Sequence, residues 1–111
     1  MIIDGKLAET VGNHPGLIMW HVSNEFGGEC FCDKCKAKFR EYLRERFHNN
    51  IDELNHEWWT TFWSARYSDY LSVEIDAIRE HSGNAKVPIT TNFMGRYYGI
   101  DYRVLAKKLD A

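Results

Sequence analysis

Two short apolar runs that lie far apart in the chain set the strongest limit on its fold. GLIMWHV and VPITTNF predict buried strands at about residues 16–22 and 87–92, and the long stretch between them has helical periodicity. Strands that alternate with helices are typical of parallel βα units. A parallel sheet needs cover on both faces and at both edges, which two strands cannot provide alone. The sequence therefore predicts either a piece of a larger α/β fold or a chain that completes itself by association.

The helical stretches are predicted from aromatic and apolar residues that recur every three or four positions. Phe39, Tyr42, Leu43 and Phe47 mark one face of a helix over about residues 33–48. A second helix is predicted over about 52–82 and a third over about 101–110, with Asp33, Asp52 and Asp101 as the N-caps of the three helices. All of these elements belong to a single segment, residues 1–111.

Composition excludes several classes of function. Lys and Arg are interleaved with Asp and Glu and the formal net charge is −2, so the sequence predicts no nucleic-acid partner. No apolar run approaches the roughly 20 residues that a membrane span needs. The first residues lack the pattern of a secretory signal, and three cysteines are an odd number. We therefore expect a cytoplasmic chain in which the thiols are reduced or bind a metal.

The dipeptide Asn24-Glu25 directly follows the first predicted strand. In α/β barrels the reacting groups lie at the C-terminal ends of the strands. A carboxyl group beside the apolar residues Trp20, Val22 and Phe26 can act as a general acid. The alternative is a solvated turn without a chemical role. Asn92 holds the corresponding place after the second strand, where it either faces a site or caps the strand end.

Three cysteines follow within a few residues of Glu25. Cys32 and Cys35 form a C-x2-C pair, and Cys30 adds a third thiol from the same loop. Thiolates are preferred ligands of structural zinc, which takes four ligands in a tetrahedron. The spacing therefore indicates a metal site, and the alternative is a set of reduced, packed cysteines.

The motifs together resemble one enzyme family over nearly the whole chain. HPGLIMWHVSNEFG is similar to the fourth strand of the catalytic barrel of glycoside hydrolase family 42, the bacterial β-galactosidases. CDKCKAKFREYLRERF and LNHEWWTTFWS resemble the helical segments that follow, and VPITTNFMG resembles the fifth strand. The resemblance implies a fragment of a (β/α)8 TIM barrel whose parent enzyme hydrolyses terminal β-galactosides. Because the rest of the barrel is missing, open strand edges and uncovered apolar faces favour association into homo-oligomers.

The resemblance also assigns roles to single residues. The family retains anomeric configuration and uses two glutamates, so Glu25 is expected to be the acid/base. Asn24 is expected to contact galactose, and Trp63 is the candidate for stacking on the sugar. Nothing in the 111 residues matches the motif of the nucleophile. Because retaining hydrolysis needs both carboxyl groups, we expect little hydrolysis by this chain alone.

The cysteine cluster acquires a structural role through the same resemblance. Many members of the family bind zinc through this cluster together with a fourth cysteine from earlier in the barrel. The substitutes considered for that ligand are His21, His48, Glu29, a water molecule and a residue of another copy. Glycosidase chemistry itself needs no metal. The alternative to a catalytic segment is a non-catalytic association or zinc-binding module derived from the barrel.

The resemblance also marks one departure from the family. Family members usually carry a longer insertion before the helix that precedes the fifth strand. Here the sequence FWSARYSDYLSVEIDAIREHSGN runs straight through, which allows one long helix.

Overall fold

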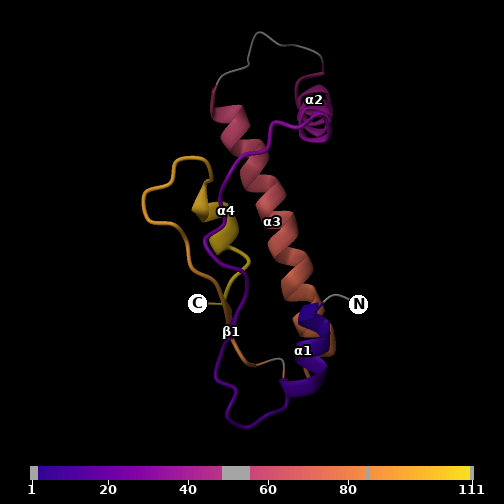
Figure 1. Ribbon diagram of the computed structural model, residues 1–111, viewed down its shortest axis with the longest axis vertical. Coiled ribbons are helices and arrows are strands. Elements are labelled where there is room, and N and C mark those ends of the chain that lie inside the picture. Colours follow the sequence, from indigo (N-terminus) through magenta and orange to yellow (C-terminus); the bar gives the residue numbers. More distant parts are fainter. Residues whose placement is uncertain (1–2, 49–55, 85, 111) are drawn as a thin grey trace.

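One long helix forms the spine of the computed structural model, which describes residues 3–48, 56–84 and 86–110 (Figure 1). The elements follow in the order α1 (Ile3–Val11), β1 (Trp20–His21), α2 (Asp33–Phe47), α3 (His56–His81), β2 (Ile89–Thr90) and α4 (Tyr102–Ala106). The molecule measures 55 × 30 × 22 Å along its principal axes. Its long axis follows α3, with α1 at one end of that helix and α2 near the other.

Helix α3 is the uninterrupted helix that the sequence allows. It has 26 residues, and residues 52–55 of the predicted range, including the predicted cap Asp52, lie outside the described residues. Helix α1 packs against the C-terminal part of α3, where His81 Nδ1 lies 3.2 Å from the Glu9 carboxylate. Helix α4 packs on α3 as well. Among the described residues, no helix is long and apolar enough to cross a membrane.

Strands β1 and β2 pair in parallel, as the βα order predicts, with Trp20 opposite Ile89 and His21 opposite Thr90. Both are shorter than the predicted ranges 16–22 and 87–92. The main-chain bonds from Trp20 N to Pro88 O and from Val22 N to Thr90 O, both 2.9 Å, mark the limits of the ladder. Ile18 and Met19 precede β1 and are exposed. A strand extends only as far as its hydrogen bonds to a neighbouring strand, and among the described residues each of the two strands has only the other as a neighbour. Both strands are therefore short.

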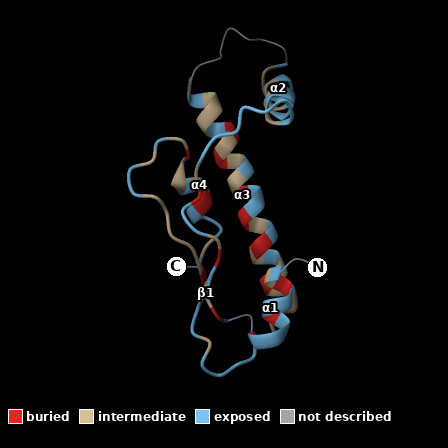
Figure 2. Ribbon diagram, viewed as in Figure 1, coloured by how far each residue is buried: buried red, intermediate tan, exposed pale blue. Residues whose placement is uncertain are grey.

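The core lies between one face of α3, the two strands and α4. Its largest fully buried side chains include Leu71, Ile78, Ile89 and Leu105, and Figure 2 shows the buried residues along that face of α3. Helix α2 has no buried residue. It contacts α3 through aromatic rings instead. In one such contact, the Phe39 ring meets the Trp59 ring edge-on, with centroids 4.7 Å apart. The half that carries α2 is therefore held by ring contacts rather than by a closed core.

Helix ends differ in detail from the sequence predictions. Asp101 caps α4 as expected, since its side chain accepts a hydrogen bond from Arg103 N, but the helix ends at Ala106 rather than near residue 110. The N-cap of α2 is Cys32, so the prediction of Asp33 is wrong by one residue. Asp33 instead occupies the first turn, where its negative charge is favourable near the helix N-terminus.

Candidate functional site

The segment after β1 forms a tight, unusual turn, here called the acid turn (residues 23–26). Ser23 and Glu25 both have positive φ values, 52° and 43°, although neither is glycine. Non-glycine residues adopt this region rarely. Val22, just before the turn, and Phe26, its last residue, are buried, whereas Asn24 and Glu25 are exposed. The turn thus anchors its flanks in the core and presents the Glu25 carboxylate to solvent, without the apolar enclosure that the sequence suggested.

The second strand holds the acid turn from one side. Glu25 N donates to Asn92 O at 3.2 Å, and Thr91 Oγ1 donates to Val22 O at 2.6 Å. Asn92 Oδ1 lies 3.0 Å from His21 Nε2. Both strand ends therefore meet at one edge of the sheet, as parallel pairing requires. These bonds to the other strand segment are what the strand-end interpretation of Asn92 predicts, and its place near a substrate stays a prediction.

The helix α3 holds the acid turn from the other side. The Ser23 hydroxyl lies 2.8 and 2.6 Å from the two oxygens of Glu74. Glu74 is buried, and burial raises the pKa of its carboxyl group, as does the charge of Asp4 to a smaller extent. Hydrogen bonds from Ser23 and Tyr70 act in the opposite direction and are outweighed.

Two tyrosines fix the glycines that follow the acid turn. The Tyr67 hydroxyl donates to Gly27 O at 2.6 Å and lies 3.1 Å from Gly28 O. Gly28 N donates to the Tyr97 hydroxyl at 3.1 Å. Gly28 has φ +93°, a conformation that side chains rarely adopt. Burial, followed by the charges of Tyr97 and Glu29, raises the pKa of Tyr67, so its hydroxyl stays a hydrogen-bond donor.

Trp63 lies in an aromatic cluster beside this loop. Its ring is half-buried and contacts the rings of Trp59, Phe62 and Tyr67, with centroids 5.7, 5.5 and 5.7 Å away. The Trp63 Nε1 atom is buried without a hydrogen-bond partner in the described structure. A buried N–H without a partner is unusual and leaves one donor available. Through Tyr67, the cluster contacts the glycines next to the acid turn.

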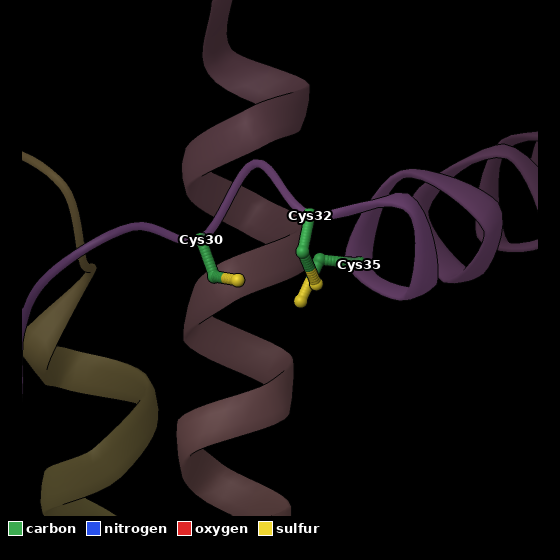
Figure 3. Close-up of side chains that lie close together, drawn as sticks. All are labelled: Cys30, Cys32 and Cys35. Atoms are coloured by element: carbon green, nitrogen blue, oxygen red, sulfur yellow. The ribbon is translucent and has the colours of Figure 1, made fainter.

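The three cysteines converge at the start of α2. Cys30 comes from the loop, Cys32 caps the helix and Cys35 lies in its first turn, with their sulfur atoms facing a common space (Figure 3). The three Sγ atoms lie within 4.8 Å of one another. The Cys35 main-chain N–H and the neighbouring thiols hold the pKa of Cys32 at about 7. The neighbouring thiols Cys30 and Cys32 raise the pKa of Cys35 to about 12.

The described residues bring no fourth His, Cys, Asp or Glu into this group. Of the substitutes considered, Glu29 Oε1 instead accepts a hydrogen bond from Trp59 Nε1 at 2.7 Å, and His21 contacts Asn92. His48 follows the last residue of α2, at the opposite end of that helix from the cysteines. The cluster is thus a set of three soft ligands with one position open.

Sequence reasoning missed the residues that hold the acid turn. Ser23, Glu74, Tyr67 and Tyr97 come from segments far apart in the chain, and no local spacing marks their contacts. The one available signal was Glu74, a carboxylate on the helix face that also carries Leu71 and Ile78. A separate groove of about 860 Å³ lies between α2, α3 and α4, but Glu25 does not line it.

Comparisons with known proteins agree on one family. The family 42 glycoside hydrolase model, described as β-galactosidase, matches residues 1–75. The β-galactosidase GanA of Bacillus subtilis is 36% identical over 145 aligned positions, covering 98% of this chain and 22% of that protein. BglY of Alicyclobacillus acidocaldarius is 40% identical, covering 91% and 19%. The chain thus spans about a fifth of the length of these relatives.

Solved structures give the same result. The crystal structure of β-galactosidase from Bacillus circulans sp. alkalophilus matches with a TM-score of 0.81 and 30% identity, covering 97% of this chain and 21% of that one. That of the β-galactosidase from Rahnella sp. R3 matches with a TM-score of 0.78 and 33% identity. The alignment with the B. subtilis relative is longer than the 111 residues here, in line with an insertion that this chain lacks.

Proposed function

Since the chain belongs to the family 42 β-galactosidases, we propose that it supplies the acid/base segment of a retaining β-galactosidase. The observation that supports this most strongly is the acid turn. It places an exposed glutamate at the C-terminal edge of two parallel strands, in a backbone conformation that packing and hydrogen bonds maintain. That edge is where α/β barrels carry their reacting groups.

Glu25 has two tasks in this proposal. It first protonates the leaving oxygen of a terminal β-galactoside, and its carboxylate then takes the proton from the water that hydrolyses the glycosyl-enzyme. The second carboxyl group must lie about 5–5.5 Å away and acts as the nucleophile. The family motif for that residue has no counterpart in the 111 residues. The chain therefore contributes half of the catalytic pair.

Asn24 and Trp63 are proposed to bind the sugar. Asn24 is exposed directly beside Glu25, where its amide can donate to and accept from a galactose hydroxyl. Trp63 is half-buried, and the exposed part of its aromatic ring is proposed to stack on the apolar face of a sugar.

The cysteine cluster is proposed to hold a structural zinc. Cys30, Cys32 and Cys35 fit the metal by donor chemistry and mutual distance, and the low pKa of Cys32 favours the thiolate that zinc requires. A bound zinc would crosslink the loop after the acid turn to α2. The fourth ligand is proposed to be a water molecule or a residue from outside the described part of the chain.

The two-stranded sheet is proposed to be part of a (β/α)8 barrel that is completed by association. Exposed apolar residues support this proposal, including Ile18 next to β1 and Leu7 and Val73 on the paired helices α1 and α3. Unpaired strand edges and uncovered apolar faces favour contacts with further copies or further barrel residues. Light scattering of the 111-residue chain is expected to give a mass above 13.1 kDa, and a stable monomer would contradict this point.

An exchange of segments tests the catalytic proposal. The matching fifth of the B. subtilis β-galactosidase GanA is replaced by this chain, and hydrolysis of 4-nitrophenyl β-galactoside is measured. Glu25→Gln should lower kcat by at least about 100-fold, the range of general acid–base contributions. Glu29→Gln is the matched control, since it lies in the same loop and keeps an acceptor for Trp59. Equal activity of the two variants would contradict the role of Glu25.

The chain by itself should show little hydrolysis, because it carries one carboxyl group of the pair. The specific alternative is a zinc-binding module without catalytic role, which the convergence of the three thiols favours. Robust turnover by the isolated chain that is abolished by Glu25→Gln would refute the claim that the nucleophile lies elsewhere. Zinc at one equivalent per chain, combined with an inactive exchanged enzyme, would favour the alternative.

A further inference from the structure

The acid turn has a backbone that its own residues do not favour. Ser23 and Glu25 both lie in the left-handed region, which is unfavourable for residues other than glycine unless the surroundings stabilise it. The neighbouring strand supplies one restraint, through Asn92 O to the Glu25 amide. That bond is 3.2 Å long and holds one of the two unusual residues. Ser23 needs a restraint of its own.

Glu74 provides that restraint from the middle of α3. The residue is 8% exposed, and both of its carboxylate oxygens lie within 2.8 Å of the Ser23 hydroxyl. A buried carboxylate is unfavourable unless it is hydrogen-bonded. The hydrogen bond to Ser23 offsets part of that cost. Hydrogen bonds to charged groups are stronger than neutral ones. An apolar residue at position 74 would fill the core between α3 and the strand without constraining Ser23.

We propose that Glu74 is a positioning residue that acts through the Ser23 hydroxyl to keep the acid turn in the conformation that presents Glu25. The inference rests on the proposed role of Glu25. Glu74 is buried, whereas Glu25 is exposed, so Glu74 acts through Ser23 and not on a substrate directly. Its contribution is to hold Ser23 at positive φ, so that the chain reverses and Glu25 N reaches Asn92 O. The acid is thus fixed from both sides, by α3 and by the end of β2.

Amide hydrogen exchange in the complete 111-residue chain tests the proposal. The first measurement is the exchange rate of the Glu25 amide, which is bonded to Asn92 O. The second is the intraresidue HN–Hα Overhauser effect of Ser23 and of Glu25, which is strong when φ is positive. Ser23→Ala should accelerate exchange at Glu25 about tenfold, as expected for loss of one hydrogen bond to a charged group. Exchange at Leu71 and Ile78, in the core of α3, should stay within about twofold.

The variants at position 74 distinguish positioning from packing. Glu74→Gln keeps an oxygen acceptor for Ser23, so exchange at the Glu25 amide should stay within about threefold of the rate in the unmodified chain. Glu74→Leu fills the same space without an acceptor and should match Ser23→Ala, and the double variant should add nothing further. Ser72→Ala, two residues earlier on the same helix, is the control. If Glu74→Leu does not fold, Ser23→Ala decides the question alone.

Two outcomes would overturn the proposal. One is unchanged exchange and unchanged Overhauser effects at Glu25 in Ser23→Ala. The other is an acceleration that is equally large at Leu71 and Ile78, or equally large in Ser72→Ala, since that would be general destabilisation. The measurement uses no substrate. A failure of the catalytic proposal therefore appears in the hydrolysis assay of Glu25→Gln, whereas a failure of this inference appears in the exchange data.

Discussion

Removing the hydroxyl of Tyr67 should destabilise the chain by an amount that can be worked out from its contacts. Tyr67→Phe keeps the ring, which packs between Phe26 and Trp63 with centroids 5.8 and 5.7 Å away. The change removes one donor that serves Gly27 O and Gly28 O at 2.6 and 3.1 Å. The loss is that of one hydrogen bond plus partial desolvation of a carbonyl, about 1–2 kcal/mol for a partly buried site.

The corresponding shift in melting temperature follows from chain length. With 111 residues, the entropy of unfolding is roughly 0.23 kcal/mol per kelvin, so 1 kcal/mol corresponds to about 4 °C. Tyr67→Phe should therefore melt about 4–8 °C lower by circular dichroism. Tyr98→Phe is the matched control, since Tyr98 is 84% exposed, and should melt within 1 °C or so of the unmodified chain.

A melting temperature for Tyr67→Phe equal to that of Tyr98→Phe would refute the reasoning. It would mean that water replaces the tyrosine hydroxyl at the two glycine carbonyls without loss. The loop after the acid turn would then be held by Tyr97 and by the cysteine cluster rather than by α3.

Two further predictions concern the metal and pH. Zinc should raise the melting temperature of the chain, and Cys32→Ser should abolish that rise, because binding to the folded state stabilises it; an equal rise in both would contradict the metal site. Glu74 has a pKa above its ordinary value of 4.5, so its contribution to stability is complete below the pKa of the unfolded chain and is lost as pH rises through the folded value. Urea unfolding should therefore show Glu74→Gln gaining stability relative to the unmodified chain from pH 4 to pH 8, and a constant difference would count against a buried carboxylate.

The sequence predicted what local patterns can encode. The spacing of Phe39, Tyr42 and Phe47 indicated α2, and the uninterrupted pattern indicated the long α3. The C-x2-C spacing found the three thiols that the structure brings together. Parallel pairing followed from the order of elements. The periodicity and the cysteine spacing lie within one or two turns of chain, whereas the pairing follows from the order of elements along the whole sequence.

The parts that failed depend on contacts between distant segments. The strands were predicted too long, because apolar residues such as Ile18 and Met19 extend the pattern beyond the hydrogen-bonded pairs. The positive φ of Ser23 and Glu25 was not predicted, since glycine or asparagine is the usual signal for that conformation. The restraint by Glu74 joins residues that lie 51 positions apart, and nothing in their spacing marks the contact.

The central claim, that Glu25 is the acid/base of a retaining β-galactosidase, is tested most directly by chemical rescue. In the segment-exchanged enzyme, Glu25→Ala is assayed on 4-nitrophenyl β-galactoside with added azide. This leaving group needs little acid assistance, and azide can attack the glycosyl-enzyme in the space that the missing carboxylate vacates. The account predicts faster turnover with azide and β-galactosyl azide as the product. Formation of α-galactosyl azide, or activity equal to that of the unmodified enzyme without azide, would contradict it.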